Sequence, residues 1–131
     1  MFLGYQEDNL SFVAETREEL ENLPCVSLSR IEETNEPVKL VGGQYKIGKD
    51  NIIEGLATIV RENRDSVLAS VVDPVVMNPL RWSDMPEAKQ KEYTDYRRYL
   101  LDMPQSKEFP CDKNFNELKV MTMEEWKESL K

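Results

Sequence analysis

Paired acidic residues are the side chains of this sequence whose type and spacing most invite a catalytic or metal-binding interpretation. They stand at Glu18-Glu19, Glu32-Glu33 and Glu124-Glu125. Two carboxylates can act as acid and base on a glycosidic bond, or they can hold a metal ion. Two of the pairs, however, fall in the first turns of predicted helices, where negative charge offsets the helix dipole. None has the aspartate spacing of a calcium loop. We therefore expect neither a glycosidase nor a metal site.

The sequence gives little support for nucleophilic catalysis. The chain contains no histidine, which excludes Ser-His-Asp and Cys-His machinery and imidazole metal sites. Cys25 and Cys111 lie far apart and have no visible activating base, so we expect reduced, inert thiols in a cytosolic protein. Gly42-Gly43 predicts a turn rather than a phosphate loop, because no Gly-Lys-Ser/Thr follows. An enzyme would have to use carboxylates or lysines alone. The sequence predicts a protein that is not an enzyme and has no cofactor.

Composition narrows the choice of partners. The chain has 131 residues, of which 40% are hydrophobic and 32% charged, with a formal net charge of -8. The acidic surplus lies mostly in residues 1–50, which carry ten acids and five bases. No basic stripe is present, so we expect no nucleic-acid partner. No apolar run is long enough for a membrane span, and the N-terminus lacks the basic region of a signal peptide. We expect a cytoplasmic protein without a membrane partner.

The elements that must position any site divide into two parts. Residues 1–48 predict a β-rich lobe with one hairpin over residues 1–13 and a second over residues 37–47, whose turn is Gly42-Gly43. Between them, Thr16 and Glu19 form a capping box that opens a brief helix. Residues 26–31 alternate apolar with polar side chains, as a strand does.

Residues 49–131 predict a helical hairpin with a C-terminal tail. The first helix spans residues 51–72 and ends before Pro74, and residues 73–79 form an extended connector. Its expected apolar stripe consists of Ile53, Leu56, Ala57, Val60, Val67, Leu68 and Val71. A second helix begins near Pro86, is capped by Asp84 and ends at Met103. An extended segment over residues 115–121 and a terminal helix opened by Thr122 follow. The expected fold class is thus α+β: a small β-rich N-terminal lobe, an antiparallel helical hairpin and a short C-terminal strand-helix tail.

Several short motifs follow one another along this hairpin. Residues Arg61, Arg64, Asp65 and Leu68 match the pattern Arg-x-x-Arg-Asp-x-x-Leu at the end of the first helix. Trp82 then precedes the second helix. One alignment of the pattern Tyr-Arg-x-x-Leu-x-Asp-x-Pro places it on Tyr96, Arg97, Leu100, Asp102 and Pro104, followed by Phe109 and Pro110. In order and spacing, residues 59–110 resemble the C-terminal region of tail assembly chaperones and tail-fibre assembly proteins of tailed bacteriophages. Members of that family also tend to begin with a short tyrosine-bearing β segment, which Leu3-Gly4-Tyr5 and Phe12-Val13 match.

The sequence departs from the family pattern at two places. The insert at residues 73–79 lengthens the link between the helices, and the closing Trp-Pro-x-x-Pro of the family is absent. Without the closing motif, any fibre contact that it makes in relatives is lost. Arg64 with Asp65, and Arg97 with Asp102, are candidates for ion pairs that fix the hairpin.

The resemblance implies a protein that binds a phage tail or tail-fibre protein. Candidate partner-binding residues are the aromatic and arginine side chains Trp82, Tyr93, Tyr96, Arg97, Arg98, Tyr99 and Phe109. A second interpretation places five side chains of this region in the core of the hairpin: Trp82, Tyr93, Tyr96, Leu100 and Phe109. Because consecutive residues on a helix cannot all face inward, we expect Arg98 and Tyr99 to face away from Tyr96 and toward the partner.

The resemblance predicts an assembly chaperone of the tail or tail fibre, acting in the host cytoplasm on a partner expected to be trimeric. One alternative is a structural virion subunit bound permanently to the fibre or baseplate. A second alternative is an acidic phage-encoded inhibitor that mimics nucleic acid, which would need its charge concentrated on one face.

Overall fold

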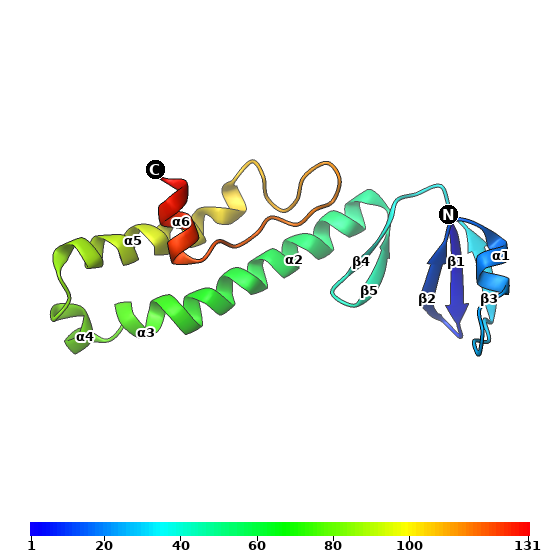
Figure 1. The fold of residues 1–131 in the computed structure, drawn as a ribbon, viewed down its shortest axis with the longest axis horizontal. Helices are drawn as coiled ribbons and strands as arrows, with labels where there is room; N and C mark the ends of the chain where they lie inside the picture. Colours follow the sequence, from blue (N-terminus) through cyan, green and yellow to red (C-terminus); the bar gives the residue numbers. More distant parts are fainter. The chain divides into compact units, whose positions relative to one another are not determined.

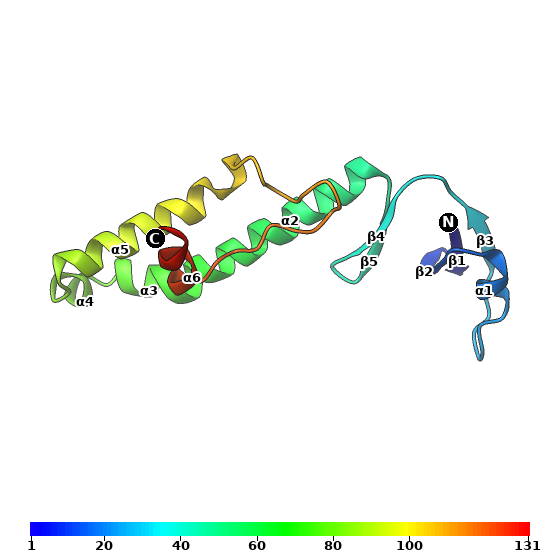
Figure 2. The same cartoon turned by 45° about the horizontal axis from the view of Figure 1, so that its top comes forward.

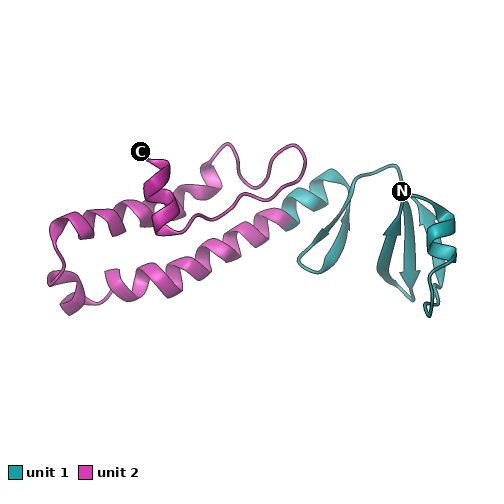
Figure 3. Cartoon of the chain, viewed as in Figure 1, with its two compact units in different colours: residues 1–55 teal, residues 56–131 magenta.

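The computed structural model describes residues 1–131 and has an α+β fold, as the sequence predicts. Strands lie in the N-terminal part and the longer helices follow them (Figure 1). The chain divides into two compact units, residues 1–55 and residues 56–131 (Figure 3). The division falls within the first long helix, seven residues after the boundary expected from the sequence. None of the helices combines the length and apolar character that crossing a membrane requires.

A three-stranded antiparallel sheet opens the first unit. Strand β1 (Phe2–Gln6) pairs on one side with β2 (Asn9–Ala14), which confirms the first predicted hairpin, and on the other with β3 (Arg30–Glu33). Helix α1 (Arg17–Glu21) begins after Thr16, whose hydroxyl accepts a hydrogen bond from the Glu19 N–H. The apolar centre of this part contains Leu3 and Leu20, which are both buried.

A two-stranded hairpin, β4 (Val38–Val41) and β5 (Gln44–Ile47), completes the strands. Gly42 and Gly43 form its turn with φ angles of 60° and 81°, a conformation that glycine adopts without strain. The first turns of the long helix approach this hairpin closely at Gly55. A Cβ built there would lie 3.1 Å from Cγ1 of Val41, so a larger residue would need the Val41 side chain to move by a few tenths of an ångström.

The first long helix does not end before Pro74, contrary to the prediction. Helix α2 (Lys49–Val67) continues as a π-helical turn, η1 (Leu68–Val72), and then as α3 (Asp73–Val76) (Figure 1). Pro74 lies in the first turn of α3, directly after the π turn, so the helix continues past it although proline supplies no N–H at this position. The expected extended connector over residues 73–79 is therefore largely helical.

The π turn also changes which side chains are buried. The Asp73 N–H donates to the Leu68 carbonyl, five residues earlier, so one extra residue is fitted into the turn. The predicted stripe is correct at Leu56 and Val60, which are buried, but wrong at Val71, which is 44% exposed. Val72 is fully buried in its place.

A short helix that the sequence did not predict joins the two long ones. Helix α4 (Pro79–Ser83) is capped by Asn78, whose side-chain oxygen accepts from the Arg81 N–H. Asp84 is the C-cap of α4 rather than the N-cap of the next helix, which corrects the prediction. Helix α5 (Glu87–Asp102) starts after Pro86 without a side-chain cap and ends in a 3₁₀ turn, η2 (Met103–Gln105). It runs back alongside η1 and α3 as an antiparallel hairpin (Figures 1 and 2).

The C-terminal tail is extended and then helical. Its only β pairing is an isolated bridge between Cys111 and Glu117. Helix α6 (Met123–Ser129) opens with the predicted capping box: the Thr122 hydroxyl accepts from the Glu125 N–H, and the Glu125 carboxylate accepts from the Thr122 N–H.

We expect Thr122→Ala to lower the free energy of unfolding by about 1 kcal/mol, because it leaves an N–H at the start of α6 without its partner. Urea denaturation followed by circular dichroism measures this loss. Thr94→Ala is the matched control, because Thr94 lies inside α5 and its hydroxyl donates to the Gln90 carbonyl. Equal losses in the two variants would show that the cap does not stabilise α6.

Candidate partner-binding surface

Tyr96 lies at the centre of the second unit. It forms a fully buried cluster with Val72 and Leu100. Partly buried apolar side chains from α2, η1, α3, α5 and the tail surround this cluster: Val67, Leu68, Val76, Tyr99, Val120, Met123 and Trp126. The prediction that Tyr96 and Leu100 belong to the core of the hairpin is therefore confirmed.

Three aromatic rings hold the tail against α5. The ring centroids of Tyr96 and Trp126 are 5.5 Å apart, and those of Tyr99 and Trp126 are 6.2 Å apart. The Tyr96 hydroxyl donates to the Met121 carbonyl at 2.6 Å, and the Met121 N–H donates to the Tyr99 hydroxyl at 3.3 Å. Sequence reasoning placed Trp126 on the terminal helix but did not assign it to the aromatic cluster, because nothing local indicates where that helix packs.

Tyr99 does not face away from Tyr96, so this prediction is wrong. The two rings are stacked with centroids 5.8 Å apart. Residues three apart on an α-helix are neighbours on one face, which explains the contact. Arg98 is exposed, as expected.

Burial shifts the titration of both tyrosines. It raises the pKa of Tyr96 to about 12, with smaller contributions from Tyr99 and Glu125. Burial also raises the pKa of Tyr99, although the hydrogen bond from Met121 opposes this change. In both cases the folded protein favours the protonated phenol.

The raised pKa of Tyr96 predicts a loss of stability at alkaline pH. Its contribution is fully present below about pH 10 and is lost as the pH rises to about 12, because the unfolded chain releases the proton first. The expected slope is about 1.4 kcal/mol per pH unit for this one group. Urea denaturation at several alkaline pH values measures it. Tyr96→Phe should reduce the slope, and an unchanged slope in that variant would contradict the assignment.

Arg97 pairs with Asp73 and not with Asp102. Its Nε lies 3.6 Å from the Asp73 Oδ1, too far for a hydrogen bond, and neither of these buried atoms has a hydrogen-bond partner. The predicted pair of Arg97 with Asp102 is disfavoured, because side chains five residues apart on an α-helix point about 140° apart. The other expected pair is present: an Arg64 guanidinium nitrogen lies 2.8 Å from the Asp65 carboxylate.

The remaining candidate residues are not gathered into one patch. Trp82 is half-buried on α4, where its carbonyl accepts from the Gln90 side chain at 2.6 Å, and Tyr93 is half-buried on α5. Phe109 lies under the Arg61 guanidinium, 5.2 Å from ring centroid to guanidinium carbon, so two residues of the family pattern do meet. Arg97 and Arg98 line a separate cavity of about 350 Å³ beside Val76 and Leu101.

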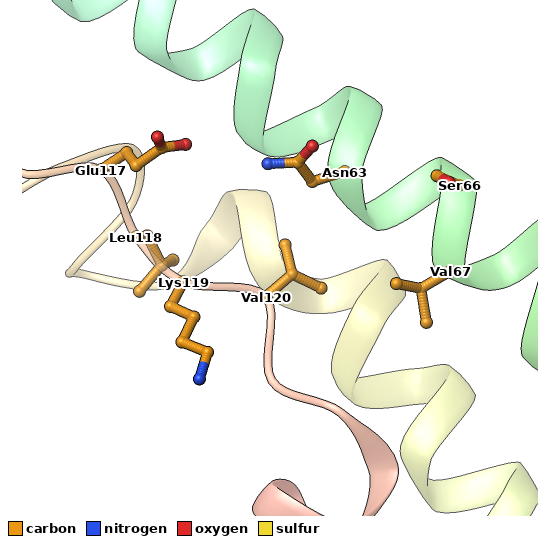
Figure 4. A pocket seen from close by; sticks show the side chains of 7 residues that line it. All are labelled: Asn63, Ser66, Val67, Glu117, Leu118, Lys119 and Val120. Carbon is orange, nitrogen blue, oxygen red and sulfur yellow. The ribbon is translucent and has the colours of Figure 1, made fainter.

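Three larger cavities, of about 490, 510 and 660 Å³, border the extended segment 117–121. The cavity in Figure 4 has a volume of about 490 Å³, with Asn63, Ser66 and Val67 of α2 on one wall and residues 117–120 on the other. The largest of the three, of about 660 Å³, lies where residues 118–121 pass the end of α5 and η2. Leu118 and Lys119 line all three cavities. Sequence reasoning missed this site, because it depends on where the tail crosses the hairpin.

Apolar side chains are also exposed at the turn between α3 and α4. Met77 is 73% exposed and Leu80 is 79% exposed. The sequence assigned Met77 to the extended connector, which ends at residue 79, and marked neither Met77 nor Leu80 as a candidate. Comparison of the chain with protein-family models, with curated proteins and with solved structures found no match to any of them.

Proposed function

We propose that this protein is an assembly chaperone for a bacteriophage tail or tail fibre. It binds the fibre or tail protein in the host cytoplasm and shields apolar or strand-edge surface until assembly. Exposed apolar surface and unpaired strand edges make a folding protein prone to aggregation, and a chaperone that covers them prevents it.

The observation that carries this proposal is the order of motifs from Arg61 to Pro110. Their positions in the fold support it. Leu68 of the first motif packs against Tyr96 and Leu100 of the second. Arg61, which opens the first motif, contacts Phe109, which closes the region. A motif set that fixes one helical hairpin would explain why its members occur in this order.

Co-expression with a tail-fibre protein tests the proposal. We expect a larger soluble fraction of the fibre protein than when it is expressed alone. A variant with a disrupted core, such as Val72→Asp, is the control and should not increase that fraction. A soluble fraction that the chain leaves unchanged would contradict the chaperone function.

Mass spectrometry of purified virions distinguishes a chaperone from a structural subunit. A chaperone leaves before assembly ends, so its peptides should be absent from the virion. Their presence at a fixed ratio to the fibre would assign the chain to the tail structure instead.

A further inference from the structure

The cavity of about 660 Å³ beside the end of α5 has an apolar floor. Tyr99 and Met103 contribute from α5 and η2, and Leu118 and Met121 contribute from the extended segment. Its volume lies within the range of about 300–1,000 Å³ that is usual for ligand pockets. Methionine side chains are flexible and polarisable, so Met103 and Met121 can adapt to a large inserted side chain. We call this cavity the apolar groove.

Carboxylates dominate the charge around the apolar groove. Glu125 is already paired with Lys119, the one basic residue of the lining. Glu108 accepts from the Ser106 hydroxyl, and this hydrogen bond holds the pKa of Glu108 below its usual value. Asp102 lies at the same rim with its side chain exposed to solvent. Asp102 and Glu108 form no ion pair with a basic side chain of the lining, although the neighbouring Lys107 also helps to lower the pKa of Glu108. The lining thus has three carboxylates and one lysine.

We propose that the apolar groove binds an extended segment of the partner protein in which a large apolar side chain is flanked by lysine or arginine. The apolar side chain would enter between Met103 and Leu118, while the basic residues would pair with Asp102 and Glu108. Charge complementarity selects this occupant, because an acidic segment would meet like charges at the rim. The identity of the partner as the tail-fibre protein rests on the proposed function, whereas the chemistry of the segment does not.

The other hollows fit such a segment less well. The cavity beside α2 is bordered by Asn63, Ser66 and Glu117 together with its apolar residues, and it offers a smaller volume. The cavity beside Val76 contains Arg97 and Arg98, which would repel a basic segment. A further cavity of about 510 Å³ has three carboxylates in its lining, but it also has three lysines and less apolar surface than the groove. The apolar groove differs from these three cavities in combining an apolar floor with an excess of carboxylates.

Labelled peptides test the proposal on the complete chain. The probe is the fluorescent peptide Ser-Gly-Lys-Phe-Leu-Lys-Gly-Ser, and its binding is followed by anisotropy and by amide chemical shifts. We expect the shifted amides to lie along residues 99–108 and 118–125. A peptide with glutamate in place of both lysines should bind at least tenfold more weakly, as should one with alanine in place of Phe-Leu. Absence of binding at millimolar peptide, or equal binding of all three, would overturn the proposal.

Charge reversal on the protein tests the rim. The double variant Asp102→Lys with Glu108→Lys changes two exposed residues, and we expect it to weaken binding of the lysine peptide at least tenfold. The matched control is Glu62→Lys with Asp84→Lys, which makes the same charge change at exposed positions outside the groove and should alter binding less than twofold. Similar losses in both variants would show attraction by overall charge and would overturn the groove as the site.

The same variants separate this inference from the proposed function. In the first case the fibre protein binds, the rim variant leaves the complex intact and Leu80→Asp weakens it. The partner then docks near the exposed Met77 and Leu80, and only the groove inference fails. If no fibre complex forms but the lysine peptide binds in the groove, the proposed function fails and the groove remains a basic-apolar peptide site.

Discussion

Val72→Asp should destabilise the helical unit by at least about 3 kcal/mol, because it buries a carboxylate without a partner. Val72 is fully buried against Tyr96 and Leu100. Val71→Asp, one residue earlier, should cost less than about 1 kcal/mol, because that position is largely open to water. Urea denaturation followed by far-UV circular dichroism compares the two variants.

This pair of variants tests the register that the π turn imposes. A continuous α-helix would follow the apolar spacing of Val67 and Leu68 and would bury Val71. The observed i→i+5 hydrogen bond from Asp73 to Leu68 instead turns Val72 inward. If Val71→Asp proved as damaging as Val72→Asp, the π turn would not exist in solution.

Tyr96→Ala should lower the free energy of unfolding by about 3–5 kcal/mol, in the range found for large aromatic residues truncated in protein cores. The substitution removes contacts with Tyr99 and Trp126 and the hydrogen bond to Met121. It should also release α6, because this helix is held to α5 largely through those rings. Loss of near-UV circular dichroism from Trp126 reports that release.

Two further variants separate the contributions of Tyr96. Tyr96→Phe keeps the ring and should cost about 1–2 kcal/mol, because the Met121 carbonyl loses its donor. Tyr93→Ala is the matched control on the same helix, at a half-buried position, and should cost clearly less than Tyr96→Ala. Similar effects of Tyr93→Ala and Tyr96→Ala would contradict the central position of Tyr96.

Local signals predicted those parts of the fold that local chemistry determines. The Gly42-Gly43 turn requires positive φ angles, and only glycine adopts them freely. Thr16 and Thr122 each accept from the N–H three residues later, as capping residues do. The two long helices were predicted from apolar spacing together with capping residues and prolines.

The predictions for Pro74 and Tyr99 were wrong because a preference of the single residue was outweighed by its structural surroundings. Proline usually ends a helix, yet Pro74 directly follows the π turn and the helix continues past it as α3. Tyr99 was expected outside because neighbouring residues on a helix diverge, but its i, i+3 relation to Tyr96 placed both on one face. Both outcomes depend on how the following segment packs, which single-residue preferences do not encode.

The candidate site was predicted only in part. The sequence selected the aromatic and arginine residues of α5 as candidates, and the structure distributes them over the interior and the surface. The apolar groove depends on the path of residues 117–121 across the hairpin, and that path is fixed by Trp126 and Met121, which are distant in sequence from Tyr96. No spacing rule connects residues so far apart.

The measurement that tests the central claim most directly is size-exclusion chromatography with light scattering on this chain co-expressed with a tail-fibre protein, the partner that we propose. We predict one soluble complex whose mass corresponds to whole numbers of both chains, and whose formation requires both. Two separate peaks, with a fibre protein that is soluble and assembled by itself, would contradict the chaperone function.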